Sequence, residues 1–356
     1  MLAPERSNVD HAATDRMRLP HPRGPISHEL VRAWSNGTGA DVASIEIERI
    51  RTHLSRFPTE RLLGDDDLHL ALYACYELHY GGIDGVDDEW EWSPPLLALR
   101  GLLEGAFEGA LRRLVPIPKE LPRPIERALG AIVRADDGVS VSRFLEADGH
   151  PHHFSEFLMH RSAYNLKEAD PHTWCIPRLR GAAKAALVEI QSDEYGGGDP
   201  AWVHAQMFAD SMDAFGLDPT PGAYVDRLPG TTLATVNLMS LFGLHRRLRG
   251  ASVGHLAAFE MTSCIPNRRY AAGLRRIGAG PRVTAYFDEH VEADAVHATL
   301  AGHDLAAGLV ALEPSLDPDV RFGACSLLEL ERRAGRAMLD AWRADRSSLL
   351  DDPIAH

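Results

Sequence analysis

The chain has 356 residues, of which 45% are hydrophobic and 25% charged, a composition typical of a globular protein with one large or two smaller domains. It excludes collagen-like, low-complexity and small disulfide-stapled proteins. The 51 acidic against 37 basic residues give a net charge of −14. This disfavours nucleic acid and anionic membrane as partners, because both bind basic surfaces.

The N-terminus and the cysteines bear on the compartment. The first 25 residues carry scattered charges without the apolar core of a signal peptide, and no later segment approaches the roughly 18 apolar residues of a membrane helix. The four cysteines are far apart and form no C-x-x-C motif, so the sequence predicts neither a structural zinc site nor a redox dithiol. We expect a cytoplasmic protein with a disordered tail over residues 1–25 and no membrane partner.

From residue 26 on, hydrophobic residues recur with the i, i+3, i+4, i+7 spacing of amphipathic helices, and alternating β-branched runs are hard to find. The sequence therefore predicts an all-α fold. The predicted helices cover residues 27–35, 40–56, 66–80, 95–114, 123–135, 151–168, 176–195, 199–213, 231–248, 252–263, 266–276, 283–306 and 324–345. Proline and glycine clusters near residues 116–122 and 149–151 separate an N-terminal helical half from a C-terminal one.

The string YFDEHVEADAVH, on the predicted 283–306 helix, carries the most informative polar pattern. His290, Asp294 and His297 stand at i, i+4 and i+7, so they project within about 60° of one another on one helix face. Two imidazoles and a carboxylate without a thiolate suit iron or manganese, and zinc is also compatible. The alternative is that these are surface or packed histidines on a solvated helix.

A metal held in a helical bundle needs ligands from other helices as well. The acidic residues that end the two predicted helices before residue 195 are candidates, namely Glu168, Glu189, Asp193 and Glu194. Their spacing does not choose among them. His204 lies among apolar residues on the next helix, where a single histidine is more often a hydrogen-bonded core residue than a ligand.

The strings KEADPHTWCIPRLRGAAKAALVEIQSDEYGGG (167–198) and YFDEHVEADAVH (286–297), with residues 76–94 upstream, resemble the heme-oxygenase-like di-iron oxidases, which are iron-containing redox enzymes. The resemblance implies a heme-oxygenase-like helical bundle with an N-terminal extension. With boundaries taken from the proline and glycine clusters, we expect a helical region that can dimerise over residues 26–125, the di-iron domain over 126–310 and a C-terminal helix and tail over 311–356. A homodimer is implied by the resemblance alone.

The family's ligand pattern also selects residues that spacing left open. Laid onto this sequence, it implies six metal ligands: Glu168, Glu194, His204, His290, Asp294 and His297. The implied cofactor is a pair of iron ions cycling between Fe(II) and Fe(III), with O2 as co-substrate. A separate reductant is implied, because the sequence has no G-x-G-x-x-G dinucleotide motif.

The resemblance favours a non-heme di-iron oxygenase that N-hydroxylates a small amine, guanidine or amino acid in specialised metabolism. Because one fold hosts many reactions, two alternatives stay open. One is a di-iron desaturase, carbon–carbon lyase or decarboxylase of an amino or fatty acid, and the other is a metal-binding scaffold without catalysis.

Five polar residues near the predicted ligand helices are further candidates for the substrate pocket or the surroundings of the metal. They are Tyr164, His172, Arg178, Glu260 and Arg268. Structural alternatives exist for three of them. His172 could cap a helix, Glu260 could be a buried ion-pair partner, and Arg178 could lie on the surface.

Overall fold

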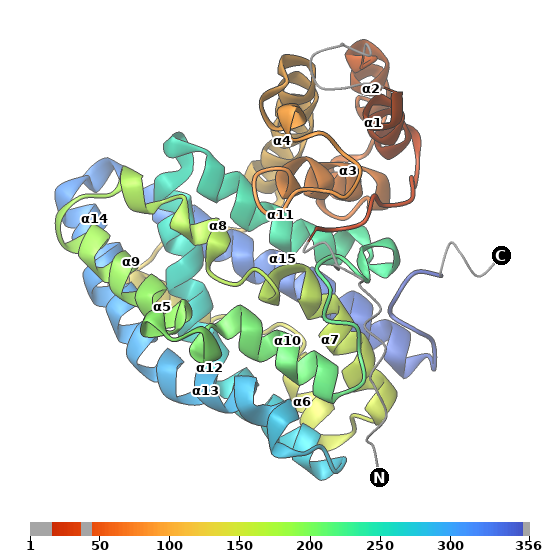
Figure 1. Cartoon of the computed structure of the whole chain (residues 1–356). Helices are drawn as coiled ribbons and strands as arrows, with labels where there is room; N and C mark the ends of the chain where they lie inside the picture. The colour runs from red at the N-terminus through yellow and green to blue at the C-terminus, as the bar shows by residue number, and fades with distance from the viewer. Residues whose placement is uncertain (1–15, 37–44, 352–356) are drawn as a thin grey trace, which may run out of the picture.

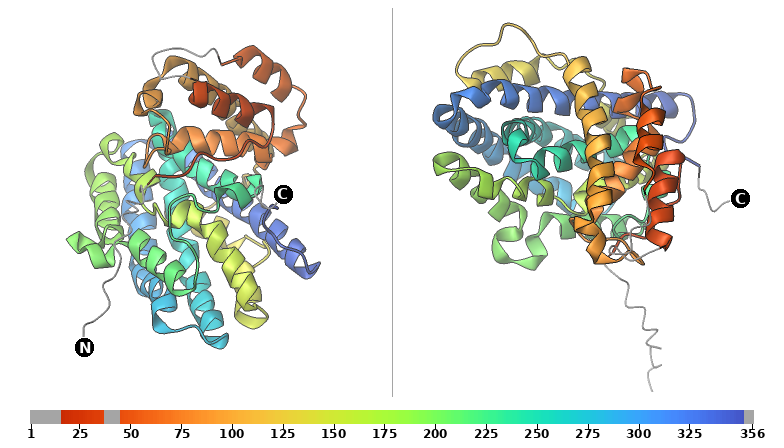
Figure 2. Two further views of the ribbon diagram at one scale, coloured as in Figure 1. Left: turned by 45° about the vertical axis from the view of Figure 1, so that its right-hand side comes forward. Right: turned by 90° about the horizontal axis from the view of Figure 1, so that it is seen from above.

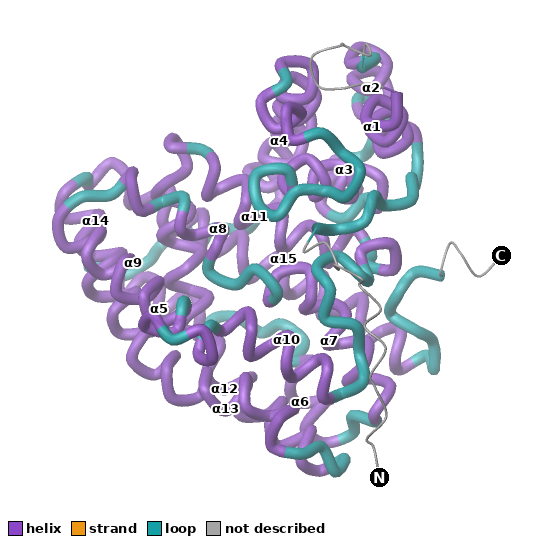
Figure 3. Tube along the Cα trace, viewed as in Figure 1, coloured by secondary structure: helices purple, strands orange, loops and turns teal. Residues whose placement is uncertain are grey.

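The computed structural model describes residues 16–36 and 45–351, and of residues 294 and 295 it describes only the backbone. Within these ranges the chain consists of helices joined by turns and loops, with no β-strand (Figures 1 and 3). The predicted all-α fold is confirmed.

Residues 16–24 lie against the helices. Met17 is buried, and its backbone carbonyl accepts a hydrogen bond from Asp84 N at 2.8 Å. Arg23 donates to the carbonyl oxygens of Val225 and Leu228 at 2.6 and 2.7 Å. The disordered tail predicted for residues 1–25 therefore does not extend over residues 16–24. The sequence could not show this, because the contacts are with backbone groups far away in the chain. Its first part, residues 1–15, lies outside the described residues.

The N-terminal helices form a layer at one end of the molecule (Figures 1 and 2). They are α1 (Pro25–Asn36), α2 (Ile47–Leu54), α3 (Asp66–Glu77) and α4 (Pro94–Leu114). The Asp65 side chain caps α3 by accepting from the N–H groups of Asp67 and Leu68. The Asp67 side chain accepts from the N–H groups of Ile26 and Ser27 near the start of α1. Helix α3 joins this layer to the rest of the molecule by packing on α11.

The remaining helices form one bundle beneath this layer (Figure 2). They are α5 (Ile125–Arg134), α6 (Val141–Ala147), α7 (Pro151–Asn165), α8 (Asp170–Thr173), α9 (Gly181–Glu194), α10 (His204–Ala214), α11 (Gly230–Leu244), α12 (Arg249–Arg276), α13 (Pro281–Thr299), α14 (Ala307–Leu312) and α15 (Asp317–Arg343). Helix α12 packs extensively against both α13 and α15.

Two glycines allow α12 and α15 to cross closely. A Cβ atom on Gly254 would lie 1.8 Å from the carbonyl oxygen of Val320, and one on Gly323 would lie 2.0 Å from that of Ala251. Only glycine permits such an approach. The crossing fixes the position of α12, which carries Glu260 into the interior of the bundle.

The structure differs from the predicted helices in two main places. Helix α12 continues through Pro266, although two helices, 252–263 and 266–276, were predicted. Proline usually ends a helix because it lacks an N–H group, but here packing against α13 and α15 holds the two halves together. The predicted 283–306 helix is α13, which changes at Leu300–Ala306 into a π-helical segment. Such wider turns often occur near functional sites.

The stretch Pro281–Leu312 is, in the part of the chain that the structure describes, long and apolar enough by composition to span a membrane. Core helices of soluble proteins pass the same test. Helix α13 within it packs against α10 and α12 and carries the buried His290 and His297. We therefore assign this stretch to the bundle.

His69 links α3 to α11 as a neutral imidazole. Its Nε2 lies 3.1 Å from the Leu62 carbonyl oxygen, and its Nδ1 lies 3.2 Å from the Asn237 amide nitrogen. The first contact requires a proton on Nε2, and the second requires that Nδ1 carries none. Burial lowers the pKa of His69 to about 4.

Stability is expected to fall as the solution is acidified. The unfolded chain binds a proton on His69 near pH 6.5 and the folded chain only near pH 4, so the unfolded state binds more protons between these values. From pH 7 to pH 5, wild type should lose roughly 2 kcal/mol more unfolding free energy than His69→Gln. Urea unfolding at both pH values measures this, with the exposed His303→Gln as control. Equal losses in wild type and His69→Gln would contradict the expectation.

Candidate metal centre

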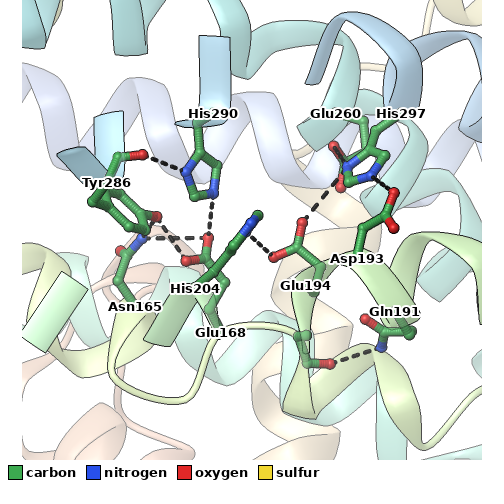
Figure 4. Close-up of polar contacts among 11 residues, drawn as sticks. Asn165, Glu168, Gln191, Asp193, Glu194, His204, Glu260, Tyr286, His290 and His297 are labelled. Carbon is green, nitrogen blue, oxygen red and sulfur yellow. Dashed lines mark hydrogen bonds and ion pairs between the residues drawn. The ribbon is translucent and has the colours of Figure 1, made fainter. Parts of the chain in front are cut away.

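Acidic and imidazole side chains from several helices converge on one buried point. Glu168 lies between α7 and α8, and Glu194 ends α9. His204 begins α10, and His290 lies within α13. One ligand-type atom of each lies within 4.8 Å of the others, and all four residues are buried (Figure 4). Two carboxylates and two imidazoles at this spacing can hold a metal ion.

A second group shares a carboxylate with the first. It consists of Glu194, Glu260 of α12 and His297 of α13, all buried and again with ligand-type atoms within 4.8 Å. His290 and His297 are about two helical turns apart on α13, so they can face two neighbouring positions. Glu194 belongs to both groups, so its carboxylate could serve as a ligand in either.

Several polar atoms in these groups lie at ion-pair distance from one another but make no hydrogen bond. Nδ1 of His204 lies 2.8 Å from Oε2 of Glu194 without hydrogen-bond geometry, and neither atom has another hydrogen-bond partner. Nδ1 of His297 is also buried without one, 3.6 Å from both Oε1 of Glu194 and Oε2 of Glu260. Unsatisfied buried polar atoms are costly. A bound metal ion would satisfy them, so these residues fit a metal centre.

Two of the imidazoles are held by the ring nitrogen that faces away from the centre. Nδ1 of His290 lies 2.8 Å from the Tyr286 carbonyl oxygen, to which it can donate. Nε2 of His297 lies 3.1 Å from Oδ2 of Asp193. Each contact places the proton on the outer nitrogen and leaves the inner nitrogen for a metal.

The charges at this point also favour a cation. Burial raises the pKa of Glu194, but the imidazoles of His204, His290 and His297 outweigh it, so the net pKa is below the usual value. Burial lowers the pKa of His297, but neighbouring carboxylates, with Glu260 the largest contributor, raise it to about 9. With this pKa, the His297 ring carries a second proton near neutral pH, on Nδ1. A metal ion that binds Nδ1 must displace that proton, so metal binding should become tighter as the pH rises.

A family model described as "Iron-containing redox enzyme" matches residues 155–332, which is half of the chain and includes both groups. The chain belongs to this family. No curated protein matches the chain. Membership makes the protein an oxidoreductase and identifies iron as the metal that the buried Glu and His residues would hold.

The structure of this iron-containing redox enzyme brings together every predicted ligand whose side chain it describes. These are Glu168, Glu194, His204, His290 and His297. The side chain of the sixth, Asp294, lies outside the described residues, although its backbone belongs to α13. Glu189, the alternative to Glu194, is exposed. Glu260, which was predicted beside the metal or the substrate, lies at ligand distance in the second group.

Tyr164 and His172 lie beside the centre. Both are buried and line a small cavity together with Glu168, Glu194 and Glu260. Nε2 of His172 lies 3.1 Å from Nδ1 of His255, so His172 contacts a neighbouring helix and does not point freely into a substrate site.

The two predicted arginines are placed elsewhere. Arg178 donates to the carbonyl oxygens of Gly243 and Leu244 and thereby caps the end of α11. Arg268 is exposed and does not line the main cavity, whereas its neighbour Arg269 does. In this family member neither predicted arginine is brought to the metal centre.

Two residues that the sequence analysis missed hold Glu168. The Tyr286 hydroxyl donates to Oε2 of Glu168 at 2.7 Å, and the Asn165 amide lies 3.4 Å from Oε1 (Figure 4). Asn165 and Tyr286 also contact each other. Helical spacing offers a signal for both, because Asn165 precedes Glu168 by three residues and Tyr286 precedes His290 by four.

A cavity of about 880 Å³ extends from the centre, which is within the size range of small-molecule sites. Glu168 and His290 lie at its inner end, and the exposed Asp136 and Arg143 belong to its outer wall. Aromatic rings make up much of its lining, among them Phe157, Phe208, Phe259 and Phe287. This arrangement gives a small substrate access to one side of the first group.

Proposed function

We propose that this protein is a non-heme di-iron oxygenase that N-hydroxylates a small amine, guanidine or amino acid. The observation that carries the proposal is Glu194, which is shared by two buried ligand groups, one of which borders a cavity of substrate size through Glu168 and His290. Ferrous ions bound there would supply the electrons that activate O2. One oxygen atom would enter an N–H bond and the other would leave as water, with two electrons and two protons drawn from a separate reductant.

The residues of the chain would contribute geometry and a dry site. Tyr286 and Asn165 fix the direction of the Glu168 carboxylate. The aromatic rings along the cavity exclude water from the reacting nitrogen, which limits loss of the oxidant to side reactions. All four cysteines are unpaired, which suits the cytoplasm as the compartment we propose.

An ion pair in the cavity wall supports a substrate with charged groups. Arg161 of α7 lies 3.3 and 3.2 Å from the two carboxylate oxygens of Glu331 on α15, and both residues line the cavity. Arg161 lies one helical turn before Asn165, the residue at the end of α7 that contacts Glu168. Arg161 could bind the carboxylate of an amino acid and Glu331 its ammonium group, leaving a nitrogen further along the molecule near the metals.

Arg161→Gln should raise the KM of an amino-acid substrate by about 10- to 100-fold with a smaller change in kcat, because a charged contact to the bound substrate is lost. Steady-state O2 consumption measures both constants. Arg321→Gln, which removes an arginine paired with Asp317 on the same α15, serves as control. An equal rise in KM for amines that lack a carboxylate would contradict this assignment.

The function itself is tested by loading the protein anaerobically with Fe(II), adding O2 and reductant, and screening amines, guanidines and amino acids. The expected result is O2 consumption with one substrate class and a product heavier by one oxygen atom, located on nitrogen by mass spectrometry. A product lighter by two hydrogens would show that the reaction is desaturation, and a cleaved product would show that it is lysis. Either result would contradict N-hydroxylation. Two bound irons without O2 consumption across the panel would favour a metal-binding scaffold.

A further inference from the structure

The backbone directly after Glu168 has a conformation that its residue type disfavours. Ala169 has φ 74° and ψ −33°. It is one of two non-glycine residues with positive φ in the described ranges, the other being Asp345. Its ψ also places it outside the small left-handed region that residues with a Cβ atom sometimes adopt. Such a conformation persists only where the surroundings hold it, and it is frequent at functional sites.

One contact that holds this turn comes from a different helix. The carbonyl oxygen of Ala169 accepts a hydrogen bond at 2.9 Å from the side-chain amide of Gln191, which is buried on α9. The same amide lies 2.9 Å from the Thr173 hydroxyl. The backbone N–H groups of His172 and Thr173 also donate to this carbonyl, but they belong to α8 and move with the turn. Gln191 is therefore an external anchor.

Gln191 and Glu194 lie one turn apart on α9 (Figure 4). The helix that supplies the shared carboxylate thus also fixes the peptide next to Glu168. If the Ala169 peptide relaxed to a negative φ, the chain direction at Glu168 would change. Its carboxylate would then leave the positions 2.7 Å from the Tyr286 hydroxyl and 3.6 Å from Nε2 of His290.

We propose that Gln191 is a positioning residue, which keeps the Ala169 turn in its disfavoured conformation so that Glu168 points at the metal centre. The proposal rests on the two-metal centre of the proposed function. It goes beyond the ligand set, because Gln191 acts through the backbone of another segment and holds no metal itself.

The test uses Gln191→Met, which keeps the side-chain volume and removes the amide, and Gln206→Met as a matched control on the exposed side of α10. A third variant adds Ala169→Gly to Gln191→Met. Glycine adopts positive φ readily, so it should allow the turn to form without the anchor. Hydrogen exchange of residues 166–174 in the metal-free chain reports on the turn, and anaerobic Co(II) titration reports the number and affinity of bound ions.

For Gln191→Met we expect faster exchange over residues 166–174 and about 10- to 100-fold weaker binding of at least one Co(II), with Gln206→Met unchanged. Adding Ala169→Gly should restore much of the affinity. If Gln191 only stabilised the fold, adding Ala169→Gly should weaken Co(II) binding further, because glycine would make the segment more flexible. Wild-type affinity in Gln191→Met, or no rescue by glycine, would overturn the proposal. A wild-type chain that binds fewer than two ions would overturn the proposed function instead, and the exchange data would still decide whether Gln191 holds the turn.

Discussion

Glu194→Gln is expected to lose both metal ions and to lower turnover by about a thousandfold or more, the largest effect of any single substitution in this chain. The two carboxylate oxygens face different groups. Oε2 lies 2.8 Å from Nδ1 of His204, and Oε1 lies 3.6 Å from Nδ1 of His297. An amide of the same shape carries no charge and cannot bridge two cations, so each group would lose a ligand at once.

Iron content per chain and O2 consumption with substrate measure this effect. Glu189→Gln is the matched control, because Glu189 lies on the same helix but is exposed. It should keep wild-type iron content and rate. If Glu194→Gln folds normally and still holds two irons, Glu194 is not a shared ligand. The main support for a di-iron centre would then be lost.

The choice between Glu189 and Glu194 shows how much of the ligand set could be predicted from the sequence. Spacing alone left both as candidates, and the family resemblance favoured Glu194. The structure supplies the physical difference. Glu194, the last residue of α9, is buried beside His204, whereas Glu189 is exposed. Helical spacing carried this signal, because Glu194 follows the buried Leu187 by seven residues and Ile190 by four, but the apolar Val188 beside Glu189, which is exposed, masked it.

The two histidines of α13 could be predicted to face the same site, because their relative direction depends on one helix alone. His290 and His297 are separated by two helical turns, so a single helix fixes their relative direction whatever packs against it. The all-α fold was predictable on the same ground, since each helix shows its own periodicity. Pro266 misled the prediction, because the packing of α13 and α15 that preserves α12 is invisible in the local sequence.

Two features of the site could not be predicted from the sequence: the contact of Gln191 with the Ala169 turn, and the position of Glu260 at ligand distance. Gln191 acts on a backbone conformation at Ala169, and an alanine gives no sign of a positive φ. Glu260 reaches the centre only because α12 crosses α13 at the level of His297. Both depend on how separate elements pack against one another, which the periodicity within each helix does not reveal.

Glu260→Gln is expected to lower the iron content from two toward one per chain and to reduce turnover by about 100-fold or more. Glu260 belongs to the second group alone, and its Oε2 lies 3.6 Å from Nδ1 of His297. The first group, which contains Glu168 and His204, keeps all its side chains in this variant. Loss of one ion would therefore separate the two groups, which Glu194→Gln cannot do.

The competing interpretation makes Glu260 a buried ion-pair partner of His297 with no metal. Glu329→Gln is the control, because Glu329 is also buried on a helix but is paired with Arg332 and Arg333 away from the centre. Both variants should lower the melting temperature of the metal-free protein. Only Glu260→Gln should also lower the iron content. Wild-type iron content and kinetics in Glu260→Gln would assign Glu260 to the structural pair, and the second ion would then need a different carboxylate beside Glu194 and His297.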